Sequence, residues 1–181
     1  MKLMFILFAM LMGASSWAFE RPLLPVSQMV APKGLDWKVG DNADYQIDIG
    51  FLKGTMHSTV RNEDARGFWV VQDIDLKIQK QKVEILYDKN TGAVLEIIVN
   101  GQKQTPPDPS DMELVDMKES HVEVPAGSFD CIYVKVRNKK ENKISEAWLN
   151  PEEVPIGGLL KTIAQSPIGP VNVQLTAFKK Q

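Results

Sequence analysis

The chain has 181 residues and a formal net charge of −2, with 24% charged and 44% hydrophobic residues. This mild balance excludes the broad basic surface of a nucleic-acid-binding protein and an acidic tail. The single cysteine, Cys131, excludes an internal disulfide. The length suits one domain that needs no second core.

Residues 1–18, MKLMFILFAMLMGASSWA, predict a secretory signal peptide. Lys2 supplies the positive start, residues 3–14 are almost entirely apolar, and Ser16 and Ala18 suit cleavage after Ala18. The apolar run is shorter than the roughly 20 residues that span a bilayer, so we expect no transmembrane anchor after signal removal. No cysteine follows the cleavage site, so we expect no lipoprotein. The mature protein is expected in a Gram-negative periplasm, or secreted.

Residues 19–36 contain three prolines and show little periodicity, which predicts an extended lead-in. Regular structure is expected from Trp37 onward. We therefore predict a single β domain over residues 37–181.

Apolar and polar residues alternate from residue 43 onward, which is the period of a strand with one buried face. The first two such strands lie within residues 43–51 and 67–78. In the second strand, Trp69 lies on the face opposite to the buried one, among aspartates and lysines. We therefore expect it to be exposed or covered by a loop. The inward parity belongs to Ala43, Tyr45, Ile47, Ile49, Phe51, Phe68, Val70, Ile74, Leu76 and Ile78.

Residues 83–99 predict a hairpin around the turn DKNTG. Both faces of this hairpin carry apolar residues, and Ile97 belongs to one of them. The proline-rich residues 101–111 predict a loop. A long strand with a bulge is expected over residues 112–125, because apolar residues change parity along it.

A second hairpin is expected over residues 130–150, around the charged turn KKENK. Two more strands are expected in residues 152–178, although residues 158–166 could instead form a short helix. The total is nine or ten strands. This count predicts an all-β fold with one strongly curved antiparallel sheet, either a half-barrel or a barrel.

Few residue patterns indicate chemistry. His57 and His121 lie among alternating strand residues without metal-ligand spacing, so we expect both on exposed strand faces and predict no metal and no cofactor. Cys131 lies mid-strand between apolar residues and is expected to be buried packing, with an intermolecular disulfide or redox role left open. Phosphate loops and nucleophile elbows are not recognisable, so we predict no enzyme.

Two stretches carry a family resemblance, VPAGSFDCIYVKV (residues 124–136) and EAWLNPEEVPIGGLLK (residues 146–161). They resemble the VPAG(S/T)F…VPxGGLxK pattern of exported all-β bacterial proteins of unknown function. In layout such proteins are similar to the periplasmic lipoprotein carriers of the LolA/LolB type, in which a curved sheet holds acyl chains. Physically, PAGSF suits a hairpin turn in which Gly127 takes positive φ, and PIGG suits a bend.

Two functions follow as hypotheses. The first is a non-catalytic binding or carrier module for a hydrophobic ligand, such as a lipid or acyl chain. The second is a structural or protein-interaction component of the cell envelope, which binds through a sheet edge or through loops such as residues 101–111. The residues expected to line the ligand are Tyr45, Phe51, Phe68, Ile74 and Ile97.

Overall fold

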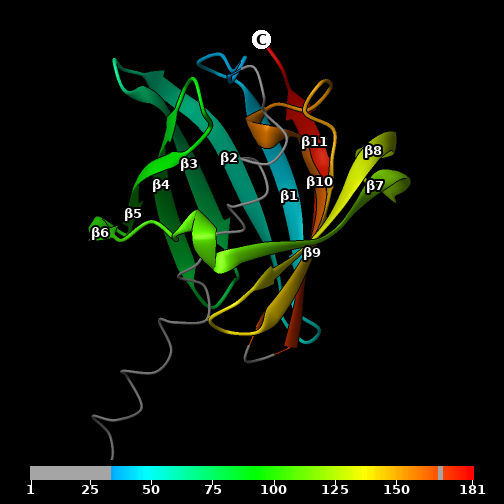
Figure 1. Cartoon of the computed structure of the whole chain (residues 1–181). Coiled ribbons are helices and arrows are strands. Elements are labelled where there is room, and N and C mark those ends of the chain that lie inside the picture. Colours follow the sequence, from blue (N-terminus) through cyan, green and yellow to red (C-terminus); the bar gives the residue numbers. More distant parts are fainter. Residues whose placement is uncertain (1–33, 167–168) are drawn as a thin grey trace, which may run out of the picture.

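In the part of the chain that the structure describes, eleven antiparallel strands form a single sheet that curls strongly without closing (Figure 1). The computed structural model describes residues 34–166 and 169–181. The predicted signal peptide, its cleavage after Ala18, and residues 19–33 of the lead-in lie outside the described residues and stay predictions. Among the residues that the structure describes, no helix is both long and apolar enough to cross a membrane.

The sheet order is β6-β5-β4-β3-β2-β1-β11-β10-β9-β8-β7, so β6 and β7 form its two edges. Two single 3₁₀ turns, η1 (Pro109–Asp111) and η2 (Ile156–Gly158), interrupt the connections. The strands are β1 (Asn42–Asp48), β2 (Lys53–Glu63), β3 (Gly67–Asp75), β4 (Lys80–Asp88), β5 (Val94–Val99), β6 (Gln102–Gln104), β7 (Met112–Val124), β8 (Gly127–Asn138), β9 (Lys143–Leu149), β10 (Leu159–Ser166) and β11 (Gly169–Lys179).

The predicted fold class is confirmed, with eleven strands where nine or ten were expected. Two strands lie outside the segments expected to be strands: β2, which carries His57, and β6, three residues long, inside the segment that was predicted to be a loop. The segment that could have been a helix is strand β10. The expected bulge in β7 exists, but it lies between Leu114 and Asp116, earlier than the parity change suggested.

The inner face of the sheet carries the core. One cluster gathers around β1 and β11, with Tyr45 and Leu175 among its members, and a second lies over β2 to β5, with Phe68 and Ile97. Ile74 packs against both clusters and so connects them. The alternation seen in the sequence therefore buries one face of these strands, as the two-residue period requires.

Irregular pairing accompanies the curl. Register shifts interrupt five of the ten strand pairs: β1–β11, β2–β3, β4–β5, β7–β8 and β9–β10. A bulge increases the local right-handed twist and bends its strand. Bulges spread around the sheet thus favour a curled half-barrel over a flat sheet.

The tip of the β7–β8 hairpin folds back onto β11. The N–H of Ala126 donates to the carbonyl oxygen of Leu175 across 3.1 Å. Gly127 takes a φ of 143° at this tip, a value that favours glycine, as expected from the sequence. The contact brings buried Phe129 and Cys131 of β8 into the core cluster of β1 and β11.

Candidate functional site

The residues predicted to line a ligand site do not all meet. Tyr45, Phe68 and Ile97 lie on the inner face and expose only 3%, 5% and 2% of their surface, and Ile74 is half-buried. Phe51 is 82% exposed in the turn after β1, outside this face. The inward parity ends there because the chain reverses direction between β1 and β2.

Aromatic side chains fill part of the inner face. The ring of Trp37 lies 6.0 Å from that of Phe68 and 5.1 Å from that of Tyr87, the latter edge-on. Edge-to-face packing at these centroid distances is favourable. An apolar ligand on this face would therefore have to displace contacts that the protein already makes.

Two tyrosine hydroxyls add polarity to this interior. Burial raises the pKa of Tyr45 well above its usual value, and the nearby Asp44 carboxylate raises it further. Burial likewise raises the pKa of Tyr87, and Tyr45 contributes in the same direction. Both phenols stay neutral at physiological pH and can donate or accept hydrogen bonds.

A shallow hollow of about 300 Å³ lies at one end of β3 and β4. Its aspartates and lysines neutralise one another in part, since Lys80 and Asp75 are 3.1 Å apart. Six of its seven lining residues are polar or charged, whereas a site for a hydrophobic ligand is lined mostly by apolar side chains. Its lining is Asp73, Ile74, Asp75, Lys80, Gln81, Lys82 and Asn100.

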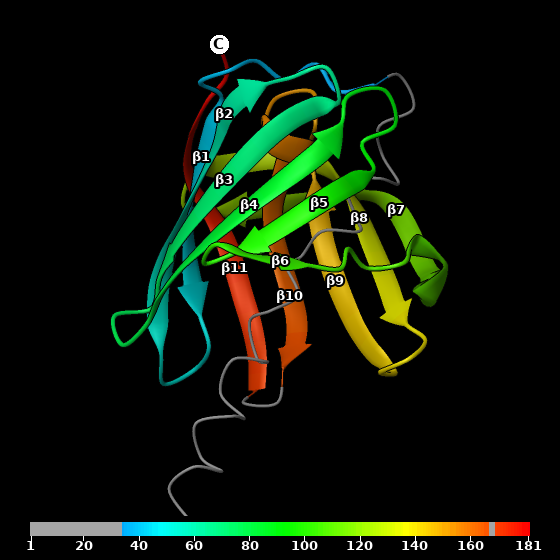
Figure 2. The ribbon, with the colours of Figure 1, turned by 90° about the vertical axis from the view of Figure 1, so that its left-hand side faces the viewer.

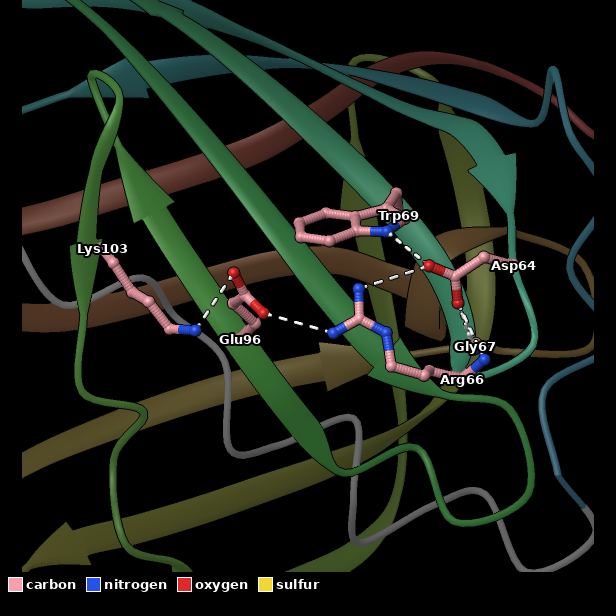
Figure 3. Close-up of polar contacts among 6 residues, drawn as sticks. All are labelled: Asp64, Arg66, Gly67, Trp69, Glu96 and Lys103. Atoms are coloured by element: carbon pink, nitrogen blue, oxygen red, sulfur yellow. Dashed lines mark hydrogen bonds and ion pairs between the residues drawn. The ribbon is translucent and has the colours of Figure 1, made fainter.

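A polar network covers Trp69 on the outer face of β3 (Figure 3). The indole N–H of Trp69 donates to Asp64 Oδ2 across 3.1 Å, and the guanidinium of Arg66 lies 5.8 Å from the ring centroid. Arg66 also reaches Glu96 at 3.4 Å, and Glu96 pairs with Lys103 at 3.3 Å. Trp69 is thus half-buried beneath a loop, which confirms one of the two settings expected for it.

Hydrogen bonds to the Asp64 carboxylate hold the β2–β3 turn in place. The backbone N–H groups of Arg66 and Gly67 donate to Asp64 Oδ1 at 2.7 and 3.2 Å. These hydrogen bonds and that of Trp69 lower the pKa of Asp64, with the Arg66 backbone bond the largest cause. The arrangement closes the β2–β3 turn, and its charges are mutually satisfied.

Both histidines have partners that the sequence did not indicate. His121 Nδ1 lies 2.8 Å from Asp130 Oδ1, and its Nε2 lies 2.7 Å from Ser128 Oγ. His57 Nδ1 lies 2.6 Å from Asp44 Oδ1. Both rings are exposed on strand faces, as predicted. The partners lie on neighbouring strands, so predicting these pairs would have required knowledge of the strand register.

The order Ser128–His121–Asp130 is that of a nucleophilic triad. Its surroundings differ from those of a catalytic triad, since the Asp130 side chain is 97% exposed and His121 is 57% exposed. Water therefore competes for every hydrogen bond, and the carboxylate cannot hold the imidazole as a buried one does. These contacts tie β7 to β8, and they carry no argument for catalysis.

Cys131 is a free, buried thiol, which confirms the packing interpretation. Burial raises its pKa, which opposes formation of the reactive thiolate, although a hydrogen bond with Ser120 acts in the other direction. The part of the chain that the structure describes contains no group of three or more His, Cys, Asp or Glu side chains that could hold a metal ion.

The open edge of the sheet at β7 combines a long strand with exposed apolar side chains. β7 has 13 residues, and no strand of the described ranges lies beyond it. Leu114, Val115 and Met117 are exposed large hydrophobics on this strand. An edge of this length offers backbone groups for an added strand, while its charged residues limit uncontrolled pairing.

The comparisons with known proteins concern the fold. No family model and no curated protein matches the chain, so the resemblance of its sequence pattern stays a prediction. The hypothetical protein CT021 from Chlamydia trachomatis is similar in structure, with a TM-score of 0.53, 16% identity, and coverage of 88% of this chain and 95% of that one. This similarity supports the fold.

Two weaker similarities have TM-scores below one half. A protein from Bacteroides fragilis, described as exported and with a YmcC-like fold, has a TM-score of 0.47 and 12% identity, and the match covers 82% of this chain and 100% of that one. A chain of the Pseudomonas aeruginosa MucA/MucB complex has a TM-score of 0.46 and 15% identity, with 86% and 54% coverage. This chain thus spans about half the length of that protein.

Proposed function

We propose that the protein is an exported, non-catalytic binding protein of the bacterial cell envelope that takes up a partner polypeptide along the open edge of β7. The observation that carries the proposal is the 13-residue edge strand with exposed Leu114, Val115 and Met117. A strand added to such an edge gains main-chain hydrogen bonds, while alternate side chains give specificity.

Strand register indicates which residues would bind. Val124 and Gly127 flank the two-residue turn and are paired across it. In an antiparallel ladder the pairs alternate, so Lys118 and Ser120 direct their backbone groups toward β8, while Met117 and Glu119 direct theirs toward the open edge. Met117 adds an exposed apolar side chain at the same place.

The start of β7 is fixed in position, as a binding edge requires. Lys140 Nζ donates to Asp111 Oδ2 at 2.6 Å, and the N–H of Lys139 donates to the Asp111 carbonyl at 2.8 Å. The loop before β7 is thereby tied to the β8–β9 turn. A preorganised edge loses less conformational entropy when a partner strand binds.

Site-specific photo-crosslinking in cells tests this proposal. A benzophenone amino acid at Met117 or Glu119 should give a discrete, larger adduct, and the same group at Leu95, an exposed residue of β5, should not. Equal adducts from all three positions, or none from the edge positions, would contradict it. Export is tested by mass analysis of the purified protein, which should begin at Phe19.

A hydrophobic-ligand carrier is the second candidate function. The curled sheet with an apolar inner face supports it, and the neutral hydroxyls of Tyr45 and Tyr87 could meet the polar end of a lipid. Native mass spectrometry of gently purified protein, followed by solvent extraction, would reveal a bound lipid. A mass without ligand in both the parent and an Ile74→Ala variant would speak against it.

A further inference from the structure

Two turns at one end of the sheet have the same construction. They are DIGFLK (residues 48–53), between β1 and β2, and DLKIQK (residues 75–80), between β3 and β4. In each, an aspartate accepts the backbone N–H two residues later: Gly50 N to Asp48 Oδ1 and Lys77 N to Asp75 Oδ1, both at 2.8 Å. Gly50 and Lys77 both take positive φ, 73° and 68°.

This construction directs one large apolar side chain outward at each tip. Ile49 and Leu76, directly after the aspartates, are buried at 2% and 3% exposure and anchor the turns in the core. After the positive-φ residue, Phe51 and Ile78 point away, with 82% and 80% exposure. These are the two most exposed large hydrophobic residues in the described ranges. The conformation of each turn directs its side chain away from the core.

The two tips lie side by side. β2 pairs with both β1 and β3, and Thr55 stands opposite Asp75. Gly54 approaches the second turn so closely that a Cβ there would lie 2.4 Å from the Asp75 carbonyl oxygen. Figure 2 shows both turns at the end of the sheet opposite the C-terminus.

Lysines surround the apolar tips. Lys53 lies 3.6 Å from Asp48 and Lys80 lies 3.1 Å from Asp75, yet the two lysine side chains are 71% and 81% exposed. Lys77 is exposed at the second tip. Three lysines against two aspartates leave a net positive charge around the tips. Positive charge around protruding apolar side chains suits an anionic lipid surface.

We propose that this end of the sheet docks on an anionic phospholipid bilayer, with Phe51 and Ile78 inserted at the level of the headgroups and Lys53, Lys77 and Lys80 against the phosphates. Two separate tips form no groove for a peptide, whereas both can enter a fluid interface together. The docking end is distinct from the open edge of β7, so the two proposals stand independently.

Vesicle co-sedimentation tests the proposal. The probes are phosphatidylcholine vesicles with and without one third phosphatidylglycerol, and the protein is the exported form of the full chain. The variant Phe51→Ser/Ile78→Ser should lose at least about tenfold in affinity for the anionic vesicles. The matched control Val39→Ser/Leu95→Ser removes two exposed apolar residues at the other end of the sheet and should bind like the parent.

A Phe51→Trp variant provides a second, positional readout. Its added fluorescence should shift to the blue with anionic vesicles and be quenched by brominated lipid. Unchanged fluorescence together with unchanged binding in the double variant would overturn the proposal. Loss of a protein crosslink in the double variant, without vesicle binding by the parent, would assign this end to a protein partner and would equally overturn it.

Discussion

His121 and Asp130 face each other across the β7–β8 hairpin, with 2.8 Å between Nδ1 and Oδ1. Ser128 completes the row at 2.7 Å from Nε2. The three residue types of a hydrolase thus meet on a surface that water reaches freely. Their geometry alone would suggest catalysis, and their exposure argues for a tie between strands.

We expect Ser128 to have no nucleophilic activity. An active-site fluorophosphonate should not label the protein, and Ser128→Ala should leave p-nitrophenyl acetate hydrolysis unchanged, because an exposed Asp130 cannot orient the imidazole. His57→Gln serves as a control for simple imidazole reactivity. Stoichiometric labelling at Ser128 would refute this prediction.

Proline substitutions should distinguish the two sides of the β7 backbone. Lys118→Pro removes a donor to β8 and leaves a carbonyl without its partner, whereas Met117→Pro removes a donor from the open edge. We expect Lys118→Pro to lower the free energy of unfolding by about 2 kcal/mol more than Met117→Pro does. Urea denaturation followed by circular dichroism measures this difference.

The same pair of variants also tests the binding edge. Met117→Pro should remain folded and lose the crosslink from Glu119. Equal destabilisation by the two prolines would show that the assigned alternation is wrong.

Gly158 should tolerate no side chain. Its φ is 73°, and a Cβ would lie 2.2 Å from the backbone nitrogen of Pro151. Gly158→Ala is therefore expected to lower the free energy of unfolding by about 3 kcal/mol or more. Gly50 is a matched control, because it has the same φ of 73° with no atom within 4 Å of a Cβ.

Gly50→Ala should thus cost only the left-handed backbone strain, about 1 kcal/mol. Thermal unfolding of both variants beside the parent separates crowding from strain. Similar losses in the two variants would mean that the η2 bend can relax away from Pro151.

Alkaline pH should unfold the protein through its tyrosines. Burial raises the pKa of Tyr45 and Tyr87 above the usual value of 10, and burial and nearby carboxylates, Glu146 first, raise that of Tyr133. The folded state therefore holds its phenolic protons more tightly than the unfolded state. This stability is fully present below about pH 10 and is lost as the pH rises beyond it.

Phenolate absorbance and circular dichroism should consequently change together above about pH 10, while the protein in urea should titrate near 10. Phenolate formation at pH 10 with an intact circular dichroism spectrum would contradict the burial of these hydroxyls.

Much of the strand pattern was predictable from the sequence. Ala43, Tyr45 and Ile47 alternate with polar residues, and the two-residue period of a strand makes that alternation a direct record of the buried face. The same local logic predicted a buried Cys131, and it gave a covering loop as one of two settings for Trp69. It did not single out β2, in which few residues are large and apolar, or β6, which is three polar residues long and has no apolar period.

Phe51 marks where this local logic ends. Its parity continues that of Ile49, but the chain turns after β1, and the positive φ of Gly50 directs Phe51 outward. When a turn falls within a continuous alternation of apolar and polar residues, the alternation alone does not reveal where the strand ends. The site residues expected from parity therefore separated into buried Tyr45, Phe68 and Ile97, half-buried Ile74 and exposed Phe51.

The sequence by itself determined the fold class, because strand formation depends on local periodicity, and it determined the surplus of strands over helices. Only the tertiary structure decided the pairing of β1 with β11, the open edge at β7 and the meeting of His121 with Asp130. These depend on register between segments that can be more than a hundred residues apart. Such register is set by bulges, turns and the packing of the whole core, which no short stretch of the chain contains.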